Sequence, residues 1–233
     1  MSGQADFTHS EQRTTEIALK NYERQSMRQL TFVRLGLSGL ALLGYFLTSQ
    51  NDQITVVMLL LCSISGFYAL RQLKLRRSIQ KTGLLLALND GIVLALIPWN
   101  YFIATPGAPA TFLLKNDEAI FALLACAVYA LLLRPLYPII IGVLSAISHV
   151  VYYFVADNFG EIIVTKSWLL ARTTEAVQLE GYFFNHLLLV PVGALLMARL
   201  TRNGRDLILR SGASEYRNAQ LARYFSPALA NRL

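Results

Sequence analysis

The stretch LYPIIIGVLSAISHVVYYFVA, residues 136–156, decides the fold class of this chain. It is predominantly apolar and contains no Asp, Glu, Lys or Arg. An α-helix needs about 20 mainly apolar residues to cross the hydrocarbon core of a bilayer. Residues 136–156 therefore predict a helix that spans a membrane.

Similar apolar runs lie on both sides of this stretch, at residues 30–47, 54–70, 82–104, 118–133 and 181–200. All the runs together predict an all-α integral membrane protein, a bundle of six transmembrane helices. The composition agrees, because 55% of the residues are hydrophobic and only 15% are charged, which is unusual for a soluble domain. Pro135, between the fourth and fifth runs, predicts a tight helical hairpin. The chain leaves no room for a second folded domain.

The basic residues predict the orientation of the bundle. The chain has 21 Lys and Arg residues, and in the six-span topology all except Lys115, Lys166 and Arg172 lie on the side of the two chain ends. Since Lys and Arg accumulate in cytoplasmic loops, both termini are predicted to be cytoplasmic. The net charge of +7 then reflects contacts with anionic lipid headgroups. The predicted partner is the lipid bilayer and not nucleic acid.

The two ends of the chain differ from the spans in composition. Residues 1–29 predict a cytoplasmic N-terminal helix, residues 30–200 the transmembrane domain, and residues 201–233 a cytoplasmic transducer helix with the start of a linker. One heptad frame in the last segment places Leu200, Leu207, Ser214 and Leu221 at position d. Polar residues in such a seam lower its stability but fix its register. The pattern fits a dimeric signalling helix and a solvated juxtamembrane helix equally well.

Two histidines are the leading candidates for a site, because ionisable residues inside a span are costly unless they are paired or functional. His149 and His186 lie at nearly equal predicted depth on two consecutive spans, near the outer surface. Two imidazoles so placed are candidate ligands of a b-type haem or a metal ion. They are also candidates to bind a small, polar or lipophilic ligand, together with Asn185, Tyr152, Tyr153 and Tyr182. A purely structural role in hydrogen bonds between helices is the third interpretation.

Other intramembrane residues predict interactions between helices. Asp90 is expected to be the only carboxylate deep in the bundle, and Arg34 lies near the same inner face. The two are predicted to form an ion pair or an interhelical hydrogen bond. Pro191 lies within the sixth span, where it removes a backbone hydrogen bond and predicts a hinge toward the transducer helix.

The end of the chain carries the most specific motif. Residues 223–233 read RYFSPALANRL, and this segment resembles the R-Y-F-S-P-x-x-x-x-x-L segment that precedes the catalytic domain of many bacterial class III adenylate cyclases. In that family a six-helix membrane domain leads through a transducing helix into this segment, which is the order predicted here. The resemblance in the spans themselves is one of arrangement.

The resemblance implies a membrane sensor and anchor domain that dimerises and regulates a cyclase, which makes cyclic AMP and diphosphate from ATP. It implies a homodimer in the bacterial plasma membrane, with the catalytic domain and its Mg or Mn beyond Leu233. No residue of this chain can be assigned to the catalytic aspartates, lysine, asparagine or arginine of that family. Two alternative interpretations are a haem- or metal-binding membrane protein that uses His149 and His186, and the receptor domain of a protein with another output, such as a histidine kinase.

Overall fold

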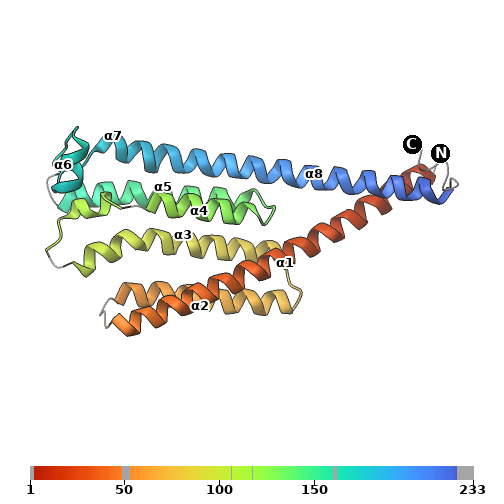
Figure 1. Cartoon of the computed structure of the whole chain (residues 1–233), viewed down its shortest axis with the longest axis horizontal. Coiled ribbons are helices and arrows are strands. Elements are labelled where there is room, and N and C mark those ends of the chain that lie inside the picture. Colours follow the sequence, from red (N-terminus) through yellow and green to blue (C-terminus); the bar gives the residue numbers. More distant parts are fainter. Residues whose placement is uncertain (1–2, 49–52, 106, 117, 160–161, 225–233) are drawn as a thin grey trace.

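The computed structural model describes residues 3–48, 53–105, 107–116, 118–159 and 162–224, and all its named elements are helices (Figure 1). This confirms the all-α prediction. In chain order the elements are α1 (Gly3–Thr48), α2 (Gln53–Lys74), α3 (Ile79–Ala104), the 3-10 helix η1 (Ala110–Leu114), α4 (Glu118–Ala130), α5 (Leu136–Phe159), α6 (Trp168–Thr173), α7 (Leu179–Tyr182), the π-helix η2 (Phe183–Leu189) and α8 (Val190–Tyr224).

Five helical segments of the described chain are long and apolar enough to cross a membrane. They are Glu16–Phe46, Ile54–Lys74, Ile79–Asn100, Leu136–Phe159 and Leu179–Ser211. Large apolar side chains lie exposed on their outer faces, for example Leu40, Phe46, Ile64 and Phe67. An exposed apolar surface of this kind is typical of helices that face lipid.

A sixth full-length span is not confirmed. The predicted run 118–133 forms α4, which has 13 residues and ends at Ala130, whereas a span needs about 20 residues. Leu133 has a φ of 55°, the left-handed conformation that commonly follows a helix end. Pro135 explains the early end, because proline lacks the N–H that a helix needs and disfavours helical backbone in the residue before it. The predicted hairpin is confirmed, since α4 and α5 pack side by side.

The two longest helices extend beyond the bundle at the same end. The first part of α1 and the last part of α8 project together, opposite the end that carries α6 and α7 (Figure 1). The predicted N-terminal helix and the first span form one continuous helix, α1, with no break near residue 30. The predicted transducer segment is likewise continuous with the last span as far as Tyr224, and the rest of residues 201–233 lies outside the described part.

The helices bury two apolar clusters. The larger cluster contains residues of α1, α2, α3, α4, α5 and α8, among them Met27, Leu86, Cys126 and Ile141. The smaller one lies near η1, α7 and the end of α5, and includes Leu113 and Tyr182. Polar residues between α4, α5 and η2 adjoin this second cluster, at the end of the bundle away from the projecting helices.

Candidate metal and ligand site

The structure brings His149 and His186 into direct contact. His149 lies on α5 and His186 on η2, and their ring centroids are 3.7 Å apart with an interplanar angle of 33°. The residues are 0% and 5% exposed, respectively. The two histidines thus lie side by side on neighbouring helical segments, while their depth in a membrane stays a prediction.

Glu118 completes the cluster, and the sequence analysis missed it. Its Oε2 lies 2.5 Å from His149 Nε2, and both side chains are 0% exposed. The expectation that Asp90 is the only carboxylate deep in the bundle is therefore wrong, because Glu118 is also fully buried. A carboxylate at the outer end of an apolar run, on the same side of the predicted membrane as the two histidines, was the available sequence signal.

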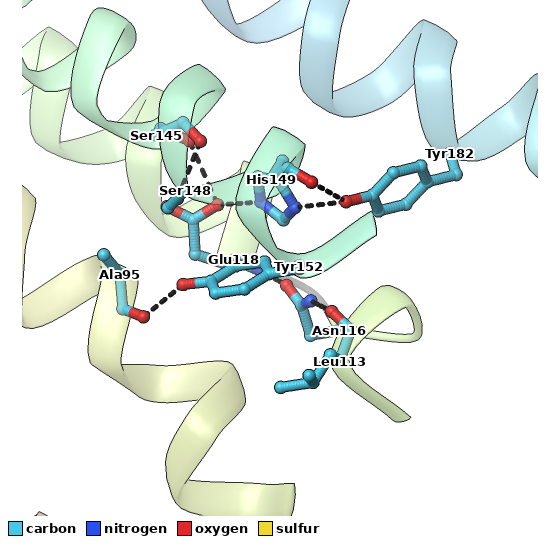
Figure 2. A network of polar contacts seen from close by, with 9 residues as sticks. All are labelled: Ala95, Leu113, Asn116, Glu118, Ser145, Ser148, His149, Tyr152 and Tyr182. Carbon is cyan, nitrogen blue, oxygen red and sulfur yellow. Dashed lines mark hydrogen bonds and ion pairs between the residues drawn. The ribbon is translucent and has the colours of Figure 1, made fainter. Parts of the chain in front are cut away.

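The start of α4 positions Glu118. Asn116 Oδ1 accepts a hydrogen bond of 3.0 Å from the Glu118 backbone N–H, and Asn116 Nδ2 donates to Leu113 O at 2.7 Å (Figure 2). An Asn before a helix commonly satisfies a free N–H of the first turn in this way. On the opposite side Ser145 Oγ donates to Glu118 Oε2 at 3.1 Å. The carboxylate is thus fixed from its own helix and from α5.

Tyr182 fixes the orientation of the His149 ring. Its hydroxyl donates to the His149 carbonyl oxygen at 2.6 Å, and the same hydroxyl lies 3.2 Å from His149 Nδ1 (Figure 2). A hydroxyl has one proton, and the carbonyl can only accept. The Tyr182 oxygen must therefore accept the hydrogen bond from Nδ1–H, which leaves Nε2 as the nitrogen that faces Glu118.

An irregular helix brings His186 to this point. Residues Phe183–Leu189 form a π-helix, and Pro191 follows in the first turn of α8. Proline has no N–H to donate, so the regular hydrogen-bond pattern of an α-helix cannot continue through this turn. Single π-helical turns are frequent at functional sites. The structure thus has a local irregularity directly before Pro191, and a hinge at Pro191 stays a prediction.

Two polar atoms of the cluster have no hydrogen-bond partner among the residues that the structure describes. Glu118 Oε1 and His186 Nδ1 are both buried and unpartnered. Buried polar atoms are nearly always paired, because leaving one unpaired costs about 1–3 kcal/mol. The two atoms belong to residues that, with His149, offer ligand atoms within 4.8 Å of one another.

An open cavity of about 720 Å³ adjoins the cluster through His186. Of the predicted ligand residues, Asn185, Tyr182 and His186 line it. The connecting segment around α6 forms the outer wall with Trp168 and Arg172. Further lining residues are Thr111, Phe112, Leu114, Lys115, Asn116, Ala171, Thr173, Thr174, Glu175, Val177, Gln178 and Gly181.

The remaining predicted ligand residues have other surroundings. Tyr152 packs edge-on against His149 with a centroid distance of 5.1 Å, and its hydroxyl donates to the carbonyl oxygen of Ala95 on α3 (Figure 2). Tyr153 contacts Phe183 at a centroid distance of 5.4 Å. Neither tyrosine lines the cavity: Tyr152 packs against the cluster, whereas Tyr153 packs against Phe183 of η2.

The rim of the cavity carries charged residues of both signs. Lys115 follows η1, and its Nζ donates to the carbonyl oxygen of Thr174, which ties η1 to the segment around α6. Partial burial lowers the pKa of Lys115 below its ordinary value of 10.5, and the nearby Glu175 partly offsets this effect.

Asp90 and Arg34 form the predicted ion pair at a different place. Arg34 Nη2 lies 2.5 Å from Asp90 Oδ1, and the Tyr129 hydroxyl donates to Asp90 Oδ2 at 2.8 Å. This pair joins α1 to α3, and Tyr129 adds α4. It is separate from the histidine cluster, and its partners give it a structural role in holding three helices together.

The geometry distinguishes the two predicted cofactors. A haem with two histidine ligands holds them on opposite faces of its flat macrocycle, which must lie between the imidazoles. The rings of His149 and His186 stack at 3.7 Å and leave no space for a macrocycle. A b-type haem between them does not fit, whereas a single ion next to two imidazoles and a carboxylate does.

Comparisons with protein-family models, curated proteins and solved structures found no significant match to this chain.

Proposed function

We propose that this chain is the membrane sensor and anchor domain of a homodimeric bacterial class III adenylate cyclase. In this proposal the domain lies in the plasma membrane with both ends in the cytoplasm, and it regulates the conversion of ATP to cyclic AMP and diphosphate. The observation that carries the proposal is the R-Y-F-S-P segment at 223–227, which begins in the last turn of α8.

The continuity of α8 supports a signalling role. The helix begins at Val190, directly after the π-helix that holds His186, and runs without a break to Tyr224. Regular helices are stiff, so a change of packing at their start is transmitted along their axis. A ligand that changes the position of His186 would thereby move the segment that leads to the catalytic domain.

Exposed apolar residues on α8 support a dimer. Leu200 and Leu207, which occupy d positions of the predicted heptad frame, are 61% and 65% exposed. Leu207 lies in the predominantly polar part of the helix, beside Arg205 and Asp206. An apolar stripe flanked by charges is the pattern through which two parallel helices associate.

A chimera tests the output. Residues 1–233 are joined in frame to a soluble class III catalytic domain, and cyclic AMP is measured in a bacterial strain that lacks its own cyclase. Because these catalytic sites form at a homodimer interface, the fusion is expected to produce more cyclic AMP than the same amount of catalytic domain alone. Equal activities, with a fusion that reaches the membrane, would contradict the proposal.

Two insertions after Ser211 distinguish a transducer from a passive tether. A helix turns about 100° per residue, so two inserted alanines rotate the catalytic domain by about 200°, while seven return it to within about 20° of its original phase. The two-residue insertion is expected to change cyclic AMP output strongly, and the seven-residue insertion to preserve it. If α8 is only a passive tether, both insertions should give the same cyclic AMP output.

A further inference from the structure

We propose that Glu118, His149 and His186 together bind one divalent transition metal ion, of which zinc is the best fit. Binding itself is independent of the function proposed above, and only the consequence of binding for the output depends on it. The inference rests on the donor set, the geometry, the supporting hydrogen bonds and the access route.

The donor set is one that zinc prefers. Two imidazole nitrogens and one carboxylate oxygen from three protein side chains form a known type of zinc site, with a fourth position left for water or another ligand. Magnesium and calcium favour sites built from oxygen atoms. The chemistry of the three residues therefore selects a transition metal.

The three side chains are already close to a binding geometry. Their ligand atoms lie within 4.8 Å of one another, and around a tetrahedral zinc such atoms are about 3.0–3.6 Å apart. Zinc needs His149 Nε2 and Glu118 to separate slightly from their 2.5 Å contact, and it needs His186 to move toward them. In this step zinc replaces the proton shared by His149 and Glu118, which is released to water.

Neighbouring residues support the ligands as expected for a metal site. Tyr182 accepts the hydrogen bond from His149 Nδ1–H and so presents Nε2 for coordination, while Ser145 donates to Glu118 Oε2. Hydrogen bonds of this kind orient ligands and adjust their affinity for the metal. The unpartnered Glu118 Oε1 and His186 Nδ1 give the buried cluster unused capacity to bind an ion.

The cavity supplies the access route and a place for the fourth ligand. His186 belongs both to the cluster and to the cavity wall, so an ion in the cavity can reach the cluster through this histidine. The rim carries Lys115 and Arg172 as well as Glu175. Its cationic groups favour an anionic small molecule at the open coordination position, which water fills otherwise.

Metal binding would join three elements of the bundle. Glu118 lies on α4, His149 on α5 and His186 on the π-helix that continues into α8. An ion held by all three would fix the start of α8 relative to the α4–α5 hairpin. If the domain regulates a cyclase, the occupancy of this site is the input that α8 transmits.

The experiment measures zinc on the chain of residues 1–233, purified in detergent through a tag without histidine. After incubation with zinc and dialysis, elemental analysis is expected to find one zinc per chain, and cobalt is expected to give the visible absorption of a tetrahedral site. Glu118→Gln and His186→Ala should each weaken binding at least 10-fold. Asp90→Asn is the matched control, because it neutralises a buried carboxylate elsewhere in the bundle, and it should bind zinc as the wild type does.

If the wild-type chain retains no zinc, the proposal is wrong, whether or not the variants fold. Stoichiometric zinc that survives both Glu118→Gln and His186→Ala overturns the assignment to this cluster. The assay contains no cyclase, so its result is separate from that of the chimera. If the chimera is active but the domain binds no zinc, only the proposed metal site is wrong. If the domain binds zinc but the chimera is inactive, only the proposed cyclase output is wrong.

Discussion

Glu23 and Arg205 are 182 positions apart in the sequence, yet Arg205 Nη1 donates to Glu23 Oε1 at 2.7 Å. The second oxygen of Glu23 accepts from Arg134 Nη2 at 2.8 Å, so one carboxylate joins α1, the α4–α5 turn and α8. Glu23 is 1% exposed, while the two arginines remain about a quarter exposed at 25% and 27%. This contact attaches the segment of α8 around Arg205 to α1 and to the α4–α5 turn.

Glu23→Gln is expected to lower the stability of the chain by about 1–3 kcal/mol, because the neutral amide cannot form the ion pairs that Glu23 makes with Arg134 and Arg205. Thermal unfolding in detergent measures the effect. Glu16→Gln is the control, since Glu16 lies on the same helix and is exposed. Equal melting temperatures for the two variants would show that the buried ion pairs do not hold α8 in place.

Tyr182→Phe should weaken zinc binding by about 10–100-fold, because the variant lacks the hydroxyl that orients His149. Titration of the purified chain with zinc, in competition with a chelator of known affinity, measures this loss. Tyr153→Phe removes a hydroxyl from a ring that contacts Phe183 and not the cluster, and it should bind zinc normally. A similar loss in both variants would contradict an orienting role for Tyr182.

Tyr129→Phe removes the hydrogen bond to Asp90 Oδ2 and is expected to destabilise the bundle by about 1–2 kcal/mol. Zinc binding should not change, because the Arg34–Asp90 ion pair that Tyr129 supports is separate from the histidine cluster. The comparison is with Tyr68→Phe, whose ring is 45% exposed. If Tyr129→Phe melts at the same temperature as Tyr68→Phe, the Arg34–Asp90 pair does not depend on its tyrosine.

Lys115→Gln is expected to alter the dependence of stability on alkaline pH. The folded chain releases the Lys115 proton at a lower pH than the unfolded chain, because burial lowers the pKa of this lysine below 10.5. Its protonated form therefore opposes folding at neutral pH, and stability increases as the pH rises through the lowered pKa toward 10.5.

Melting temperatures measured across this alkaline range should rise more in the wild type than in Lys115→Gln, and Lys166→Gln should follow the wild type. Lys166 serves as the control because it is an exposed lysine in the same part of the chain. Parallel curves for all three proteins would contradict a lowered pKa at position 115.

The sequence by itself determined the helical, membrane-type architecture, because local composition is enough to predict it. An uncharged stretch such as residues 136–156 forms a helix that can hide its backbone polar groups from lipid whatever surrounds it. The sequence also predicted the Arg34–Asp90 pair and the neighbouring positions of His149 and His186, because ionisable side chains at similar depth inside a membrane are costly unless they find partners.

Tertiary structure decided the rest, because those features depend on contacts between distant parts of the chain. Glu118 looked like the edge of an apolar run until the α4–α5 hairpin placed it against His149. No sequence pattern pairs Glu23 with Arg134, and only the packing of α8 brings Arg205 beside them. No local pattern fixes where helices pack against each other, and the site is built from three elements that only packing brings together.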